Sequence, residues 1–146
     1  MPSEVPTMRR MCFYLITFAL TALATTAIAA DQLKQYQWKQ RVLLIHANEN
    51  AGAIRLMLDQ NQQAINERDL VWFLVSPSGI QSNHEQDITP SLQQQITNTL
   101  KESPGAAAVL IGKDGSIKGR YSDLNLDVAF GLIDTMPMRK KEMSDP

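Results

Sequence analysis

Three apolar runs stand out along the chain, at residues 42–47, 70–75 and 107–111. Runs of this length without an alternating polar position are typical of strands that are covered on both faces. A fourth segment, residues 117–121, alternates uncharged and charged side chains, which favours a half-exposed edge strand. The pattern therefore predicts three buried strands and one edge strand.

The segments between and after these strands have apolar residues at helical spacing. Between the first two runs, apolar residues within 54–65 fall on one helical face. A second helix is predicted over residues 90–100, because Thr89 is a suitable N-cap and is followed by a proline. A third helix is expected to begin after Asn125 and to stop at Pro137.

Together these elements give the order β-α-β-α-β-β-α. Asp114-Gly115 predicts a hairpin between the last two strands, and the first two strands form a βαβ unit, which is parallel and right-handed. We therefore expect an α/β fold of the thioredoxin-like layout, with a central four-stranded mixed sheet flanked by helices. Apolar residues make up 44% of the chain and charged residues 20%, as in ordinary packed domains. Residues 30–146 are predicted to form this one domain.

The first 29 residues have the three parts of a secretory signal peptide. Arg9-Arg10 is followed by an uncharged apolar run and by small residues at Ala27 and Ala29. A membrane anchor is the alternative, because the uncharged run approaches the roughly 20 residues that span a bilayer. The small residues favour cleavage after Ala29 or Ala30, so we expect a periplasmic or secreted protein.

Cysteine usage excludes one class of activity. Cys12 is the only cysteine and would leave with the signal peptide. Thioredoxins carry a Cys-x-x-Cys pair where the first strand meets the first helix, and these two positions fall near Asn50 and Ala53 here. Disulfide exchange through a cysteine of the mature chain is therefore excluded. The net charge of -1 gives no basic excess for nucleic acid or an anionic membrane.

Four local strings resemble a bacterial family of exported proteins, domain-of-unknown-function family 4174, which is similar to the DUDES domains of secreted animal proteins. The strings are WKQRVLL, ERDLV, LIGKDG and IDTMPMRKKEM, at residues 38–44, 67–71, 110–115 and 133–143. The resemblance covers residues 33–143. It implies a thioredoxin-like fold and no established activity.

The junction between the first strand and the first helix offers the candidate catalytic groups. His46 could act as an acid or base beside Glu49, and backbone N–H groups near Asn50 could bind an anion. The structural interpretation is that His46 only ends a buried strand. His84 lies near Glu85 and Asp87, but no ligand spacing there is diagnostic of a metal.

Other charged residues are expected to be structural. An ion pair at Arg68-Asp69 could fix the turn into the second strand, and Lys113-Asp114 is interpreted as turn chemistry. Lys118 and Arg120 are expected to form a solvated face.

The C-terminal segment is the remaining candidate for binding. Its methionines could pack the last helix, contact a partner or bind copper(I). Its basic residues could interact favourably with the helix dipole at the C-terminal end of that helix. The residues concerned are Met136, Met138, Arg139, Lys140, Lys141 and Met143. We favour a non-catalytic binding module for an unknown protein or small-molecule partner, with no cofactor. A non-thiol enzyme using His46 and Glu49, and a weak copper carrier, are the alternatives.

Overall fold

The computed structural model describes residues 31–145, so the predicted signal peptide lies outside the described residues. The strands are β1 (Arg41–His46), β2 (Leu70–Ser76), β3 (Gly79–Ser82), β4 (Ala108–Ile111) and β5 (Ile117–Tyr121). The helices are the short 3₁₀ helix η1 (Gln32–Tyr36) and the α-helices α1 (Ala51–Gln60), α2 (Gln62–Glu67), α3 (Pro90–Lys101), α4 (Leu126–Thr135) and α5 (Pro137–Ser144). None of the helices in the described part of the chain combines the length and apolarity that crossing a membrane requires.

One mixed sheet of five strands organises the fold, in the order β3-β2-β1-β4-β5. β1 pairs in parallel with β2, and every other neighbouring pair is antiparallel. This confirms the predicted α/β class with a mixed sheet, and the arrangement is consistent with a thioredoxin-like fold. The Asp114-Gly115 hairpin is also confirmed, with Gly115 at a φ of 81° in the left-handed region that such turns require.

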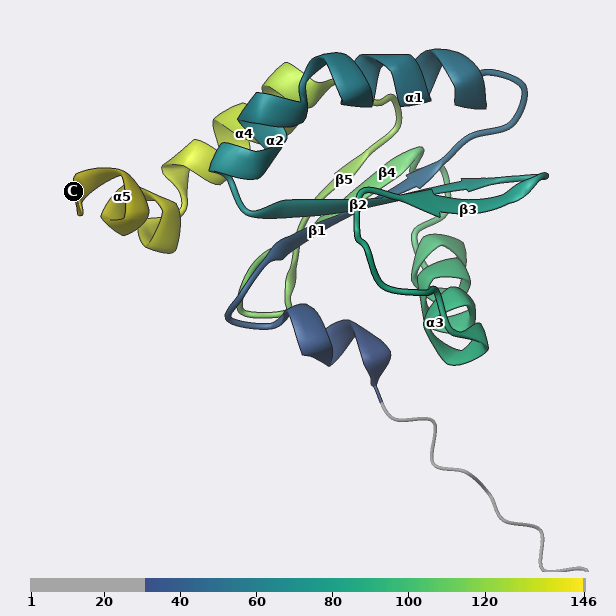
Figure 1. Ribbon diagram of the computed structural model, residues 1–146, viewed down its shortest axis with the longest axis horizontal. Helices are drawn as coiled ribbons and strands as arrows, with labels where there is room; N and C mark the ends of the chain where they lie inside the picture. Colours follow the sequence, from purple (N-terminus) through teal and green to yellow (C-terminus); the bar gives the residue numbers. More distant parts are fainter. Residues whose placement is uncertain (1–30, 146) are drawn as a thin grey trace, which may run out of the picture.

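Helices cover both faces of the sheet (Figure 1). α1, α2 and α4 cover one face, which buries Leu43, Ile45 and Trp72, whereas α3 and η1 cover the other, which buries Leu44 and Phe73. Successive residues of a strand point to opposite faces, so a strand covered twice must be apolar at every position. This is why β1 and β2 are continuous apolar runs.

The prediction of a four-stranded sheet was wrong, because the sheet has an additional strand, β3. The sequence pattern predicts no element between residue 75 and Thr89, but Gly79 takes a φ of 124° and turns the chain back along β2. The side chain of Asn83 then continues the pairing, because its amide accepts from the Trp72 N–H (2.9 Å) and donates to the Leu70 carbonyl (3.1 Å). The strand is short and half-exposed, so its sequence carries no apolar run.

Two helix boundaries also differ from the prediction. The first helix breaks at Asn61, whose side-chain amide donates to the Met57 carbonyl at 2.8 Å. The closing helix does stop before Pro137, but this proline then begins a further helix, α5. Met136 lies between α4 and α5 with ψ at 139°, the extended backbone that a following proline favours. The predicted caps at Thr89 and Asn125 are confirmed.

Candidate functional site

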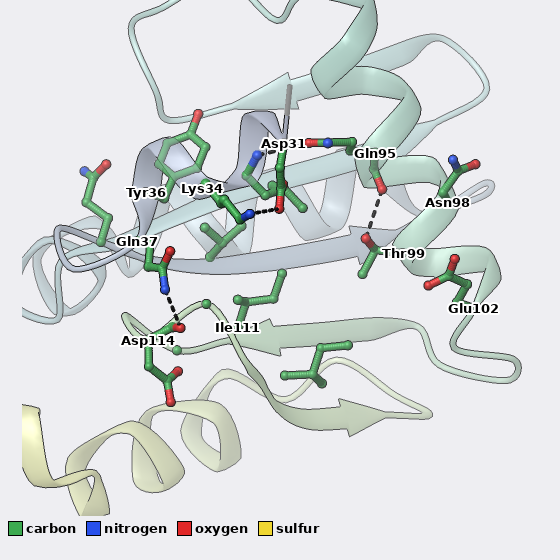
Figure 2. Close-up of a pocket in the computed structure, with 16 residues that line it drawn as sticks. Asp31, Lys34, Tyr36, Gln37, Gln95, Asn98, Thr99, Glu102, Ile111 and Asp114 are labelled. Atoms are coloured by element: carbon green, nitrogen blue, oxygen red, sulfur yellow. Dashed lines mark hydrogen bonds and ion pairs between the residues drawn. The ribbon is translucent and has the colours of Figure 1, made fainter. Parts of the chain in front are cut away.

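A cavity of about 430 Å³ lies between η1, α3 and the turn that joins β4 to β5 (Figure 2). Its apolar lining comes from strand residues such as Val42, Ile111 and Ile117. It lies at the amino-terminal end of β1, whereas the thioredoxin active-site position lies at the opposite end of that strand. This volume is within the range of small-molecule binding sites.

Side-chain amides hold the walls of the cavity together. Gln95 of α3 accepts a hydrogen bond from the Leu33 N–H of η1 at 3.0 Å. Gln37, just after η1, donates to the carbonyl oxygen of Asp114 in the β4–β5 turn at 2.9 Å (Figure 2). At Gly115 a Cβ would meet the Gln37 side chain at 3.4 Å, which is an ordinary contact, so the φ of 81° rather than the space favours glycine here.

The lining combines an apolar floor and side-chain amides with four charged side chains, those of Asp31, Lys34, Glu102 and Asp114. Gln40, Asn98 and Thr99 add amide and hydroxyl groups to those of the walls. Lys34 forms an exposed ion pair with Asp31 at 3.7 Å. No histidine, cysteine or serine is among the lining residues in the described part of the chain. The cavity therefore offers hydrogen-bond donors and acceptors to a ligand.

A second cavity, of about 310 Å³, lies at the carboxyl-terminal end of β1 and includes exposed His46 and Lys101. Glu49 and Asn50, which are also exposed, are not among its lining residues. Asn50 is the N-cap residue of α1, and its side chain makes no capping hydrogen bond. The structure thus does not bring His46, Glu49 and Asn50 together around one cavity.

A cluster of charges at the opposite end of β1 was not predicted. Arg41 is fully buried, and its two terminal nitrogens donate to the Glu142 carboxylate at 3.2 and 3.3 Å. Lys113, 9% exposed, donates to Glu142 at 2.6 Å and to Asp69 at 2.8 Å. Arg41 also donates to the Arg68 carbonyl at 2.8 Å. One carboxylate of α5 thus bridges two cations, and Asp69 supplies the second negative charge.

A second set of bonds holds the start of α5. Arg139 donates to the Glu67 carbonyl at 2.7 Å and to Asp134 at 3.3 Å. Arg68 donates to the other oxygen of Asp134 at 2.6 Å, and its guanidinium stacks on the Phe130 ring at 4.6 Å. These contacts give Arg68 the structural role expected for it. Its partner is Asp134 rather than Asp69, whose partner is Lys113.

Several interpretations of charged residues change as a result. Lys113 is not simply turn chemistry, since it is buried in the cluster. Arg139 does not belong to an exposed basic end, because its side chain is only 12% exposed, whereas Lys140 and Lys141 are exposed. Lys118 of the expected solvated face pairs with Asp114 at 2.6 Å.

Arg41 and Glu142 are the cluster residues that sequence reasoning missed entirely. Two signals were present. Arg41 begins a strand whose next four residues are all apolar, and Glu142 is the only acidic residue of α5.

The methionines and histidines occupy different environments. Met136 packs against the core, whereas Met138 and Met143 are exposed. His84 packs edge-on against the Tyr36 ring, with ring centroids 5.3 Å apart. Within residues 31–145, no group of three or more histidine, cysteine, aspartate or glutamate side chains could hold a metal ion. The copper interpretation rests on the methionine sequence alone.

The cluster carboxyls should make stability depend on pH. Burial opposes ionisation of Glu142 and Asp134. Hydrogen bonds from Lys113 and Arg41 to Glu142 outweigh this effect and lower the pKa of Glu142 from its ordinary 4.5. Hydrogen bonds from Arg68 and Arg139 likewise lower the pKa of Asp134 from its ordinary 3.8. The folded state then binds fewer protons than the unfolded state. Stability is expected to be complete above about pH 5 and to fall as pH drops through the folded pKa values.

Urea unfolding followed by circular dichroism between pH 7 and pH 3 would measure this dependence. The Glu142→Gln variant should lose part of the slope below pH 5, because it lacks one of the carboxyls. An unchanged slope in that variant would contradict a role for Glu142 in acid sensitivity.

Fold and cavity together define the class of protein: an α/β domain of the mixed-sheet type, with a polar-walled cavity. The chain belongs to a family described as a domain of unknown function, DUF4174, which matches residues 32–142. No curated protein and no solved structure matches the chain. The four sequence strings that resemble this family converge in space. Each contributes a residue to the charge cluster, through Arg41, Arg68, Asp69, Lys113, Asp134, Arg139 and Glu142.

Proposed function

We propose that this protein is an exported, non-catalytic binding module whose ligand site is the cavity between η1, α3 and the β4–β5 turn. The observation that carries the proposal is the lining of that cavity, in which side-chain amides surround an apolar floor. Sites of this composition fix a ligand by hydrogen bonds and bury its apolar parts. Export to the periplasm is supported by the composition of residues 1–29.

The ligand class follows from the charges. Lys34 is already paired with Asp31, and Asp114 is paired with Lys118, whose hydrogen bond lowers the pKa of Asp114. Neither pair presents an unbalanced charge to a ligand. An ionic ligand would have to compete with these pairs, whereas a neutral one would use the amides. Glu102 is exposed and also lines the cavity, so its carboxylate disfavours an anion. We therefore infer a small molecule without negative charge, with hydroxyl or amide groups on an apolar frame.

Nuclear magnetic resonance titration tests this proposal. The probes are neutral monosaccharides, N-acetylated sugars, polyols and N-acetyl amino-acid amides. We expect at least one class to shift the backbone amide signals of the lining residues in a saturable way. Thr99→Trp should weaken binding at least tenfold, because the indole fills the cavity from α3. Gln94→Trp, on an exposed part of the same helix, should bind like the wild type.

Two results would contradict the proposal. One is the absence of saturable shifts with every probe class. The other is a set of shifts centred on His46 and the second cavity, which would favour the non-thiol enzyme.

The protein for this titration should be prepared from cells that express the full chain. Recovery from the periplasmic fraction with Ala30 or Asp31 as the first residue would support export, and retention in the cytoplasm would exclude it.

A further inference from the structure

The C-terminal helix α5 is attached to the domain in an unusual way. It buries none of its own residues, although it is eight residues long. Packing of an apolar face normally provides most of the stability of a helix in a protein. Within the described residues, the side chains that bond α5 to other elements are Arg139 and Glu142. Polar contacts therefore hold α5 in place.

The surface that receives α5 belongs to the rigid part of the domain. Arg41 is the first residue of β1 and is fully buried, and Lys113 lies two residues after the buried end of β4. Their nitrogens surround the Glu142 carboxylate, with Arg41 contacting both of its oxygens. Two-pronged arginine contacts of this kind are a specific mode of carboxylate recognition. The Nε of Arg41 is also buried and has no hydrogen-bond partner.

A second contact fixes the register of the helix on this surface. Arg139 precedes Glu142 by three positions, which places both side chains on one face of α5. Arg139 reaches the Glu67 carbonyl and Asp134, while Glu142 reaches Arg41 and Lys113. The surface thus binds one positive and one negative side chain of the helix, Arg139 and Glu142, three positions apart. The helix it recognises carries arginine and glutamate in the pattern Arg-x-x-Glu.

The connection between α4 and α5 permits exchange of that helix. It consists of Met136 alone, in an extended conformation between two helices. Exchange of an identical element between chains is a low-cost route to dimers, and a short hinge favours it. Every contact that α5 makes through Arg139 and Glu142 could form equally well with a second copy.

We propose that the surface formed by Arg41, Lys113, Glu67 and Asp134 is a recognition site for an Arg-x-x-Glu helix, which α5 fills within its own chain and the α5 of a second copy fills in trans. This surface is separate from the ligand cavity, since none of these four residues lines it.

A complementary pair of variants tests the proposal. Lys113→Glu repels Glu142 and releases an intact α5, whereas Arg139→Ala/Glu142→Ala leaves the receiving surface intact and empty. Each variant alone should be monomeric in sedimentation velocity, and an equimolar mixture should contain a one-to-one complex. Lys140→Ala/Lys141→Ala is the matched control, because α5 keeps Arg139 and Glu142. Its mixture with Lys113→Glu should stay monomeric.

A peptide experiment decides the matter if Lys113→Glu fails to fold. The peptide PMRKKEMSD, residues 137–145, is titrated into the Arg139→Ala/Glu142→Ala protein by nuclear magnetic resonance. The same peptide with glutamine at position 142 should bind at least tenfold more weakly, since truncating a buried charge contact typically costs more than the roughly 1.4 kcal/mol of a tenfold change. Complex formation or this difference between peptides supports the proposal. The absence of both overturns it.

Discussion

Replacing Arg41 with alanine is expected to lower the free energy of unfolding by about 3 kcal/mol. The substitution removes both of its bonds to Glu142 and leaves the Arg68 carbonyl without that donor. It also opens a cavity beneath α5, because Arg41 is fully buried. Lys113 continues to neutralise Glu142, which keeps the loss at the lower end for a broken buried ion pair. Urea unfolding at pH 7 measures the loss.

Two comparisons separate charge from volume. Arg41→Met keeps most of the volume and should cost less than Arg41→Ala, since it leaves a smaller cavity. Lys34→Ala, which removes an exposed ion pair, should change stability by less than about 0.5 kcal/mol.

The coupling between Arg41 and Glu142 can also be measured directly. In a double-mutant cycle, Arg41→Ala should cost less when Glu142 is already alanine, because the interaction between them is then absent. Strictly additive losses would show that Arg41 acts through packing alone. That result would also weaken the assignment of Glu142 as the residue that docks α5.

The strands and helix starts could be predicted because each depends on local sequence. β1 and β2 are continuous apolar runs, and Thr89 and Asn125 are capping residues next to apolar stripes. These signals act within a few residues. The strand β3 escaped prediction because it has four half-exposed or exposed residues, and its pairing depends on the turn at Gly79 and on Asn83.

The candidate sites could not be predicted for a different reason. Arg41 and Glu142 are 101 positions apart in the chain, so nothing local indicates that they meet. The amides of Gln37 and Gln95 look like ordinary solvated positions until η1 and α3 lie side by side. Asn50, by contrast, lies where the local sequence places it, at the start of the first helix. Both the ligand cavity and the helix-recognition surface are at the other end of β1.

This separation bears on how the fold is used. In a thioredoxin the chemistry sits at the junction between the first strand and the first helix, where the helix N-terminus favours a thiolate. Here the turn joining β4 to β5 takes part in two sites instead. Lys113 binds Glu142, while Asp114 and Gly115 line the cavity. Docking of α5 and binding in the cavity therefore involve neighbouring residues of one turn.

Replacing Trp72 with alanine is expected to cost about 4 kcal/mol, the largest loss of any substitution considered. Its ring is fully buried on the face covered by α1, with the Arg55 guanidinium 5.1 Å from the ring centroid. Trp72→Phe should cost less, because it keeps an aromatic ring and removes an indole N–H that is buried without a partner. Urea unfolding followed by circular dichroism measures both losses.

The second tryptophan supplies the matched control. Trp38 is 65% exposed, and its backbone N–H, which alanine would keep, donates to the Lys113 carbonyl. Trp38→Ala should therefore change stability by less than about 0.5 kcal/mol. Equal losses at the two positions would show that the face of the sheet beneath α1 is not the tightly packed core described here. A large loss at Trp72 alone would show that this buried face carries much of the stability of the domain.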